Sequence, residues 1–394
     1  MIEVEQQQAA VATLPRRAPR SLRIALFTGN YNYIIDGVSR TLHRTVEYLE
    51  RRGHRVLVFG SAGSGPALPA PGQFVAIPSM AIPGRGDYRL GTRISGRARV
   101  RLDAFAPDLI HIATPDILGY SALRYGRSRG TPVVSSFHTH YSSYLRYYRL
   151  GWLEPLVWRY LRSFYARCRQ TLVPSLSMLK ELRSRGFTGE MRLWARGIDA
   201  DAFGPERRSL AWRRELGIGN GEVVVAFVSR LVKEKGLDAY VAATEELSRR
   251  GLAHRRLIVG DGPERGRLAA RLPDAIFTGH LEGPALARAY ASADVFLFPS
   301  ETETFGNVTL EAMASGLPVV CANATGSSYL VENGVSGFLA SPRDLADPLA
   351  LLVADPTLRA DMGAAARARA RRFSWAEAMQ LLETSYCDAM AGSR

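Results

Sequence analysis

The sequence has only three cysteines, Cys168, Cys321 and Cys387, and no two of them form a C-x-x-C pair. Cysteines this few and this far apart argue against a disulfide framework and a thiolate metal site, and they fit a reducing cytoplasm. Long apolar runs are also missing, since no segment approaches the roughly 18 apolar residues that a membrane-spanning helix requires. Residues 1–20 lack the apolar stretch of a signal peptide, and we expect them to form a disordered leader. These absences predict a cytoplasmic protein, either soluble or peripheral to a membrane.

Acidic residues are scarce in the first half of the chain. Residues 1–200 contain 29 Lys and Arg against 13 Asp and Glu, which gives a charge of +16. Residues 201–394 contain 22 against 24, which gives −2. The whole excess of positive charge therefore belongs to one half, and it indicates an anionic partner there: a membrane surface, a nucleic acid or an acidic substrate.

Short apolar strands alternate with helical patterns in two successive series, as in parallel sheets covered on both faces. The first series has expected strands at 22–27, 56–59, 109–112 and 132–135 and a helix at 38–52. The second has expected strands at 222–228, 256–259, 275–277, 294–298 and 318–321 and a helix at 236–250. We predict an α/β protein with two doubly wound, Rossmann-like domains, 21–195 and 196–372, that face a central cleft. We expect a C-terminal helix, 373–394, to pack back on the first domain.

Two glutamates, Glu303 and Glu311, flank an expected helix start in the segment 299–318. Free N–H groups at a helix N-terminus suit an anionic or hydroxyl-rich ligand, and Gly306 lets the backbone approach it closely. A carboxylate can accept hydrogen bonds from two vicinal hydroxyls of a sugar or a ribose. The same spacing also fits a helix-terminal charge at Glu303 and a solvated residue at Glu311.

Two cations, Arg230 and Lys235, follow the expected strand 222–228. Fixed cations beside a helix N-terminus can neutralise a diphosphate leaving group without a metal ion. A basic surface turn would have the same composition. Gly37, in the turn after the first strand, can admit a phosphate or simply form that turn.

Two histidines, His138 and His140, follow the expected strand 132–135. Either can hydrogen-bond a donor sugar or serve a structural role. No carboxylate or thiolate cluster accompanies them, and the pair Asp199 and Asp201 falls at the join between the domains, so we expect no metal. The glycines from Gly260 onward lack the G-x-G-x-x-G spacing of a dinucleotide site, and we expect no nicotinamide cofactor.

These motifs follow one another as they do in retaining glycosyltransferases of family four, and the chain resembles that family over residues 22–385. The matching segments are Asp36-Gly37-Val38, Phe137-His138-Thr139, Trp194-Ala-Arg-Gly-Ile-Asp199, Arg230-Leu to Lys235-Gly236, Gly260-Asp-Gly-Pro263 and Glu303-x7-Glu311. The last is specific, because the family has two glutamates at this spacing with Phe-Gly between them. The resemblance implies the GT-B fold. Many members carry more glycines near position 36 than this chain does.

The resemblance also implies a role for each matching residue. Glu303 would contact hydroxyls of the donor sugar, and Glu311 the ribose. Arg230 and Lys235 would stabilise the departing diphosphate, and His138 would touch the donor sugar from the opposite domain. The remaining donor-binding positions, which would pack against or donate N–H groups to the sugar and phosphates, are Gly37, Phe305, Gly306 and Asn307. Retention in the family is explained by front-face attack, which requires no strongly basic side chain.

The segments around His138 and Trp194 are most similar to sulfoquinovosyl-, glucuronosyl- and mannosyl-diacylglycerol synthases and to phosphatidylinositol mannosyltransferases. We therefore expect transfer of a hexose or uronic-acid-type sugar from a UDP- or GDP-sugar to a lipid such as diacylglycerol or phosphatidylinositol. The nucleotide-sugar would be a co-substrate, and no cofactor is expected. A soluble or polysaccharide acceptor stays open, as does a GT-B nucleotide-sugar epimerase, which needs no acceptor.

The basic half contains two candidate contacts for the membrane and the acceptor. One is a set of arginines that recur every four residues, as on one face of a helix or in a glycine-containing loop that orders on binding: Arg85, Arg89, Arg93 and Arg97. The other is the aromatic, leucine- and arginine-rich stretch 144–164, including Tyr144 and Trp152, which suits an interfacial helix. Solvated basic faces and core helices have similar compositions. A nucleic-acid-binding protein would show a helix-turn-helix, zinc or RNA-recognition pattern, and none is present.

Overall fold

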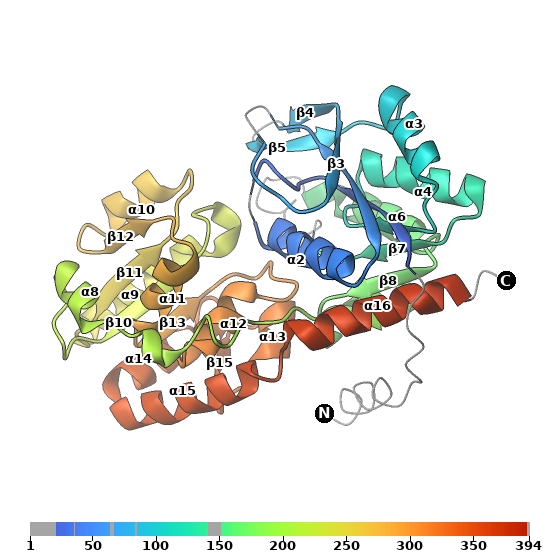
Figure 1. Cartoon of the computed structure of the whole chain (residues 1–394). Helices are drawn as coiled ribbons and strands as arrows, with labels where there is room; N and C mark the ends of the chain where they lie inside the picture. Colours follow the sequence, from blue (N-terminus) through green and yellow to red (C-terminus); the bar gives the residue numbers. More distant parts are fainter. Residues whose placement is uncertain (1–20, 35, 64–66, 83–84, 141–150, 392–394) are drawn as a thin grey trace.

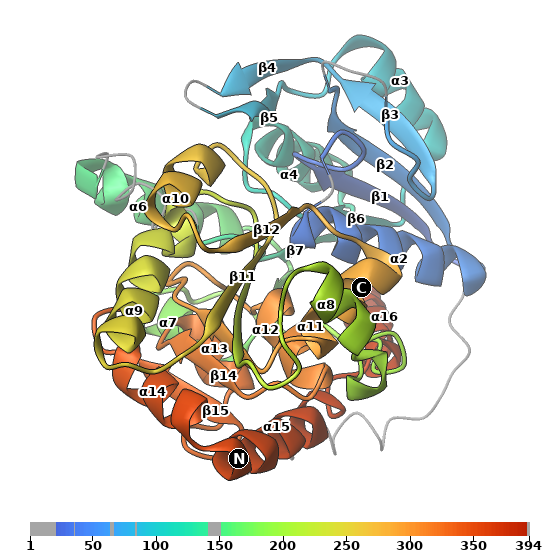
Figure 2. The ribbon, with the colours of Figure 1, turned by 90° about the vertical axis from the view of Figure 1, so that its left-hand side faces the viewer.

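The computed structural model describes residues 21–34, 36–63, 67–82, 85–140 and 151–391, and it has two lobes (Figures 1 and 2). Each lobe is a parallel sheet with helices on both faces. This arrangement confirms the predicted α/β class with two Rossmann-like units. No helix of the described part of the chain is both long and apolar enough to cross a bilayer.

The sheet of the first lobe has seven parallel strands in the order β3-β2-β1-β6-β7-β8-β9. The strands are β1 (Arg23–Thr28), β2 (Arg55–Ser61), β3 (Gln73–Ile77), β6 (Leu109–Ile112), β7 (Val133–Ser136), β8 (Gln170–Val173) and β9 (Met191–Leu193). The helices are α2 (Gly37–Arg51), α3 (Gly96–Phe105), α4 (Ile117–Arg129), α6 (Glu154–Tyr165) and α7 (Leu176–Ser184). The central strands are buried along their length because helices cover both faces of the sheet.

Helix α2 begins where the sequence provides a cap. The Asp36 carboxylate accepts hydrogen bonds from the backbone N–H groups of Val38 and Ser39, and the Ser39 hydroxyl accepts one from the Asp36 backbone. Such a capping box stabilises a helix start by about 1 kcal/mol. The apolar face of α2, which includes Leu42 and Val46, is fully buried against the sheet.

The sheet of the second lobe has six parallel strands in the order β12-β11-β10-β13-β14-β15. The strands are β10 (Val224–Val228), β11 (Arg255–Val259), β12 (Ile276–Gly279), β13 (Val295–Phe298), β14 (Val319–Ala322) and β15 (Gly337–Ala340). The helices are α8 (Leu210–Glu215), α9 (Leu237–Arg249), α10 (Arg265–Arg271), α11 (Gly283–Ala291), α12 (Asn307–Ala314), α13 (Thr325–Leu330), α14 (Ala346–Ala354) and α15 (Pro356–Ala370). From β10 the chain adds strands first on one side of the sheet, β11 and β12, and then on the other side, beginning with β13. Open α/β sheets bind ligands at such a switch point.

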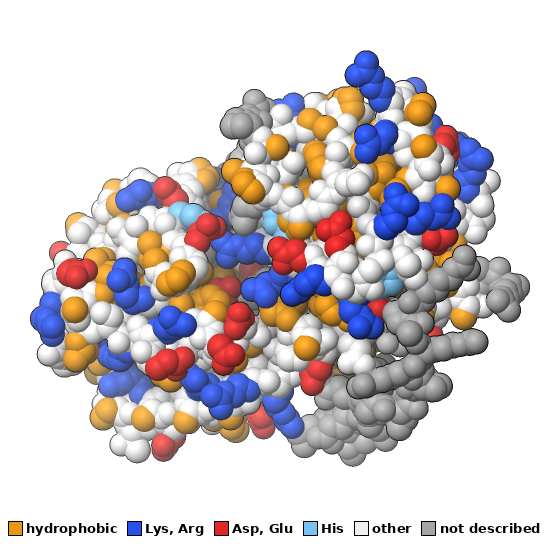
Figure 3. Space-filling view, in the orientation of Figure 1, with side chains coloured by type: hydrophobic (Ala, Val, Ile, Leu, Met, Phe, Trp, Pro, Cys, Tyr) orange, Lys and Arg blue, Asp and Glu red, His pale blue; other side chains and the backbone are white. Residues whose placement is uncertain are grey.

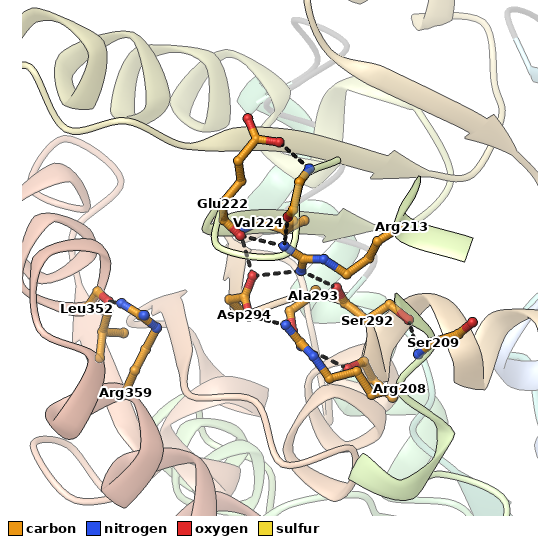
Figure 4. Close-up of polar contacts among 12 residues, drawn as sticks. Arg208, Ser209, Arg213, Glu222, Val224, Ser292, Ala293, Asp294, Leu352 and Arg359 are labelled. Carbon is orange, nitrogen blue, oxygen red and sulfur yellow. Dashed lines mark hydrogen bonds and ion pairs between the residues drawn. The ribbon is translucent and has the colours of Figure 1, made fainter. Parts of the chain in front are cut away.

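A buried arginine joins the starts of β10 and β13 (Figure 4). The guanidinium of Arg213, fully buried, donates to Oδ2 of Asp294 at 3.0 Å and to the carbonyls of Ser292 and Glu222. Oδ2 of Asp294 also accepts a hydrogen bond from the backbone N–H of Val224 at 2.8 Å. The charge of Arg213 is therefore paired and hydrogen-bonded, as burial requires.

The chain passes between the lobes twice, and the two passages lie side by side. The backbone N–H of Ile198 donates to the carbonyl of Phe373 at 2.8 Å. A Cβ on Gly197 would lie 2.2 Å from the backbone nitrogen of Trp375, so only glycine allows this approach. After the second passage, helix α16 (Trp375–Ala391) runs along the first lobe, where Tyr386 and its neighbours join the core of that lobe.

The segment that contains Arg85, Arg89, Arg93 and Arg97 forms neither the single helix nor the loop that we expected. Residues 79–91 form an antiparallel hairpin of β4 (Ser79–Ile82) and β5 (Arg85–Gly91). Arg85 and Arg89 belong to β5, Arg93 lies in the following connection, and Arg97 lies in the first turn of α3. Glycines at both ends of the segment oppose a helix, and the backbone instead pairs with Ser79–Ile82.

Candidate active site

Charged side chains of both signs gather around a hollow between the two lobes (Figure 3). Two helix N-termini meet there. A Cβ on Gly37, the first residue of α2, would lie 3.2 Å from Nδ2 of Asn307, the first residue of α12. Two helix starts that converge from opposite lobes concentrate positive dipole ends, which favour an anion between them.

The side chains of Glu303 and Lys235 are in contact. Nζ of Lys235 lies 2.5 Å from Oε1 of Glu303, and the two side chains are 19% and 16% exposed. The Ser300 hydroxyl donates to the same carboxylate oxygen at 3.3 Å. The structure thus brings together one cation and one carboxylate that are 68 residues apart in the sequence.

Glycine at position 236 explains how Lys235 reaches this place. Gly236 has φ of +73°, and a Cβ there would lie 2.6 Å from the carbonyl oxygen of Pro299. Only glycine accepts both this backbone conformation and this approach. The backbone after Lys235 therefore packs against the end of β13, from which the loop carrying Glu303 begins.

The loop of Glu303 is fastened to the first lobe through its neighbour Thr304. The Thr304 hydroxyl donates to the backbone carbonyl of His138 at 2.8 Å, and the Ser175 hydroxyl donates to the carbonyl of Thr304 at 2.9 Å. The carbonyl of Glu303 itself accepts from the N–H of Gly326 at 2.8 Å. These bonds hold the Glu303 backbone in place from both lobes.

The residues that follow build the start of α12. Phe305 is 3% exposed, and its ring packs against Tyr329 and Phe373. Gly306 has φ of +99°, which a side chain would strain, and α12 begins at Asn307. This turn presents the first-turn N–H groups of α12 toward the junction with Gly37.

Glu311 lies further along α12, where its carboxylate accepts a hydrogen bond from the Tyr290 hydroxyl at 3.0 Å. Burial raises the pKa of Glu311 to about 7, while Tyr290 and the nearby Arg40 and Arg44 lower it. Glu311 lines a cavity of about 280 Å³ between α2 and the second lobe. With a pKa near 7, the Glu311 carboxylate gains or loses its proton near neutral pH.

Arg230 contacts a residue of the first lobe, Tyr88, that the sequence patterns did not identify. Nη1 of Arg230 donates to the hydroxyl of Tyr88 at 3.0 Å, and that hydroxyl donates to Oδ2 of Asp36 at 2.8 Å. Tyr88 belongs to β5 and Asp36 caps α2. The sequence shows Asp36 directly before the glycine that starts α2. No sequence pattern near Tyr88 predicts a contact with the second lobe.

His138 lies at the end of a chain of buried hydrogen bonds. Its Nδ1 contacts Nη2 of Arg196 at 2.5 Å, and its Nε2 contacts the Ser136 hydroxyl at 2.7 Å. The Ser136 hydroxyl contacts His111, which in turn contacts the hydroxyl of Tyr386.

Arg196 determines which ring nitrogen of His138 carries the proton in this hydrogen-bond network. Arginine only donates, so Nδ1 of His138 must accept and the ring is neutral with its proton on Nε2. Burial and the nearby charge of Arg196 lower the pKa of His138 well below its usual range, which agrees with a neutral ring. Both ring nitrogens are thus bonded to protein groups, and contact with a donor sugar would require one of these bonds to exchange. His140 instead pairs with Glu181, and the contacts of this carboxylate with His140 and Arg185 lower its pKa to about 2.

The positions expected to contact the membrane and the acceptor are dispersed. Arg93 and Arg97 are exposed, and Arg89 is half-buried with its guanidinium bonded to Ser79. Tyr144 lies outside the described residues. Trp152 is 73% exposed, directly before α6.

Trp152 belongs to an exposed apolar patch. Leu156 and Tyr160 follow it at one-turn intervals along α6, and the Tyr160 hydroxyl donates to the carbonyl of Pro115 just before α4. We call this surface the α6 patch; its exposed apolar members are Trp152, Leu156, Tyr160, Ile117 and Tyr120. The opposite side of α6 is buried in the core. A stripe that leaves such large side chains in water indicates a contact surface.

The remaining motifs have structural explanations. A Cβ on Gly260 would lie 1.9 Å from the carbonyl oxygen of Ser229, so this glycine permits close packing between two strand ends. Asp199 accepts hydrogen bonds from the N–H of Ala202 in a local turn. Among the residues that the structure describes, no group of three or more His, Cys, Asp or Glu could hold a metal ion.

Comparison with known proteins agrees with this geometry. The profile described as Glycosyltransferase Family 4 matches residues 35–202, and that described as Glycosyl transferases group 1 matches residues 222–355. The chain is 33% identical over 390 residues to a sulfoquinovosyl transferase of Arabidopsis thaliana, with 95% of this chain and 76% of that protein covered. It is 32% identical over 387 residues to a GDP-mannose-dependent alpha-mannosyltransferase of Corynebacterium glutamicum, with 95% and 91% covered.

A solved structure shows the same fold. Sucrose-phosphate synthase from Thermosynechococcus elongatus superimposes with a TM-score of 0.78 at 21% identity, over 95% of this chain and 100% of that one. The resemblance inferred from the motifs is therefore confirmed, and so is the GT-B fold. The chain belongs to glycosyltransferase family 4, and it is a glycosyltransferase.

Proposed function

We propose that the chain is a retaining, metal-independent glycosyltransferase that moves a hexose or uronic-acid-type residue from a UDP- or GDP-sugar to a lipid hydroxyl at the cytoplasmic membrane face. The single observation that supports it most is the contact between Lys235 and Glu303, beside Arg230 and the two converging helix starts. This arrangement provides cations for a diphosphate and a carboxylate for sugar hydroxyls within one site.

Lys235 and Glu303 form an ion pair with each other, and we propose that the donor exchanges these partners. Lys235 turns from Glu303 to the diphosphate, and Glu303 then accepts hydrogen bonds from the donor sugar. The acceptor oxygen forms its bond to the anomeric carbon on the face from which the diphosphate oxygen departs. The acceptor proton passes to that departing oxygen, so no protein base is needed. Fixed cations that meet the developing charge lower the barrier.

The lipid acceptor is supported by the α6 patch and by relatives. Apolar side chains such as Trp152 and Leu156 project from the strongly basic half of the chain, a combination that suits an anionic bilayer surface. One relative, 29% identical over 323 residues, is an alpha-monoglucosyldiacylglycerol synthase of Streptococcus pneumoniae, with 78% of this chain and 72% of that protein covered. We propose by analogy that a lipid with a free hydroxyl is the acceptor here.

The test is a mass-spectrometric screen of UDP- and GDP-sugars with the full-length chain and a membrane lipid extract. We expect one donor to yield a glycolipid in which the anomeric configuration of the donor is kept, and we expect EDTA to leave the rate unchanged. A Glu303→Ala variant serves as the inactive control. Product only on soluble glycans would contradict the lipid acceptor, and donor epimerisation without any acceptor would contradict transfer.

A further inference from the structure

Arg196, in the motif 194–199, is a buried cation that forms no ion pair with a described carboxylate. Its Nη2 donates to Nδ1 of His138 at 2.5 Å, while its Nη1 is buried and has no hydrogen-bond partner among the residues that the structure describes. Burial lowers the pKa of Arg196 to about 9, so the group stays charged at neutral pH. A buried charge with so few partners reduces stability, which indicates a role other than stability for this arginine.

The histidine that Arg196 contacts lies where the two lobes meet. The backbone carbonyl of His138 accepts a hydrogen bond from the hydroxyl of Thr304 at 2.8 Å, and Thr304 directly follows Glu303. On the other side of the ring, Nε2 of His138 contacts the Ser136 hydroxyl at 2.7 Å. His138 is therefore held next to the loop whose carboxylate we expect to bind the donor sugar.

The two hydrogen bonds of the His138 ring differ in what their loss would cost. If Nδ1 were released, the guanidinium of Arg196 would keep no hydrogen bond to a described residue, and a buried charge would be left unsatisfied. If Nε2 were released, the Ser136 hydroxyl would still contact Nε2 of His111 at 2.9 Å. The bond to Ser136 is therefore the one that we expect an oxygen of the donor to replace.

We propose that Arg196 is a positioning residue: it keeps the proton of His138 on Nε2, so that His138 donates a hydrogen bond to an oxygen of the donor sugar. The inference rests on the proposed function, because it takes a nucleotide-sugar as the ligand. When the donor binds, the Nε2–H group exchanges the Ser136 hydroxyl for the sugar oxygen, while Nδ1 stays bonded to Arg196. His138 then binds and orients the sugar and takes no proton from the acceptor.

The first measurement locates the proton directly. In the full-length chain with isotope-labelled histidine, proton–nitrogen NMR distinguishes protonated from unprotonated ring nitrogens, and the signals missing from His138→Asn identify this ring. We expect the wild type to carry the proton on Nε2. Arg196→Lys provides an ammonium group, which only donates, so the same tautomer should persist. The amide of Arg196→Gln both donates and accepts, so both tautomers should appear.

The second measurement is calorimetric titration with the nucleotide-sugar found in the screen and, separately, with its nucleoside diphosphate. For Arg196→Gln we expect the affinity for the nucleotide-sugar to fall about fivefold, the loss of one hydrogen bond, while the affinity for the nucleoside diphosphate changes less than about twofold. Arg196→Lys should recover most of the lost affinity. A purely structural role of Arg196 would affect both ligands alike, so the difference between them isolates the sugar contact.

Arg192 provides a matched control. It lies on β9 in the same lobe and forms ion pairs with Glu190 at 2.8 Å and with Asp388 of α16. Arg192→Gln should change neither the tautomer of His138 nor the affinity for the nucleotide-sugar.

A His138 ring that carries only the Nε2 proton in Arg196→Gln, or that carries its proton on Nδ1 in the wild type, would overturn the inference. Equal losses of affinity for the nucleotide-sugar and the nucleoside diphosphate would also overturn it. If the wild type bound no UDP- or GDP-sugar, the proposed function would fall, while the NMR spectra would still decide whether Arg196 sets the tautomer.

Discussion

Nζ of Lys235 lies 2.5 Å from Oε1 of Glu303, so these two opposite charges form an ion pair within the candidate site. Both side chains are largely removed from water, which makes the loss of either partner costly for the one that stays. The contact therefore connects donor binding with the electrostatics of the resting site.

The first prediction concerns Glu303. Glu303→Ala removes the carboxylate expected to hold the donor sugar, and we expect kcat/KM to fall at least about 100-fold, as for loss of a preorganised charged group. Steady-state kinetics with the donor found in the screen would measure this. Glu301→Ala is the matched control, because Glu301 is exposed and lies two residues earlier. Wild-type-like turnover of Glu303→Ala would refute the assigned role.

The second prediction is a pH dependence from Glu311, whose pKa burial raises to about 7. An ionised carboxylate is the better acceptor for ribose hydroxyls, so the KM of the donor should fall as pH rises through about 7. The same group makes folding less favourable as pH rises from about 4.5 to 7, because the folded chain retains a proton that the unfolded chain has lost. Above pH 7 this penalty is constant.

Glu311→Gln should remove both effects. The KM of the variant should be high at all pH values, and its unfolding midpoint should exceed that of the wild type at pH 8 but approach it near pH 4.5. Steady-state kinetics with the donor between about pH 4.5 and 8 would test the effect on KM. Thermal unfolding over the same pH range would test the effect on stability. A KM profile of the variant that still bends near pH 7 would assign the titration to another group.

The third prediction concerns the α6 patch. Trp152→Ser combined with Leu156→Ser removes two exposed apolar side chains, and we expect binding to phosphatidylglycerol-containing vesicles to weaken at least about tenfold. Co-sedimentation would measure it. Leu351→Ser, which changes an exposed leucine of the second lobe, is the control. Equal binding of the wild type to neutral and anionic vesicles would argue against docking by charge.

The fourth prediction concerns stability. Arg213→Met leaves Asp294 with fewer partners and several buried carbonyls without a donor, and we expect it to lower the free energy of unfolding by about 3 kcal/mol. Arg214→Met should change it little, because Arg214 is exposed. Urea unfolding of the two variants compares them directly. Similar midpoints would show that the network in Figure 4 contributes little.

Strong apolar runs made most of the fold predictable. The expected strands 22–27, 109–112 and 294–298 all appear within one or two residues, because their side chains are buried on both faces. Strand β9 was missed because it has only three residues, all half-buried, and no distinct pattern. The hairpin at 79–91 was missed because neither of its two strands has a distinctive residue pattern. Each strand is stabilised by pairing with the other.

The candidate site was predictable in composition but not in pairing. The motifs marked Glu303, Lys235 and Arg230, but the contact of Lys235 with Glu303 depends on the tertiary fold of the second lobe, and that of Arg230 with Tyr88 on how the two lobes meet. No local pattern could show that Arg230 would bond Tyr88 or that both ring nitrogens of His138 would be engaged. The contact of Arg230 with Tyr88 joins residues 142 positions apart, and that of His138 with Arg196 joins residues 58 positions apart, so both follow from the tertiary fold.

The paired passages between the lobes have a mechanical consequence. Because Ile198 is hydrogen-bonded to Phe373 and forms a β-bridge with Ser374, we expect the two connecting segments to bend together and the lobes to swing mainly about one shared axis. We therefore expect the cleft to open and close by rotation of the lobes about this hinge. Gly197 keeps the two segments of this hinge close together, since any side chain at this position would push them apart.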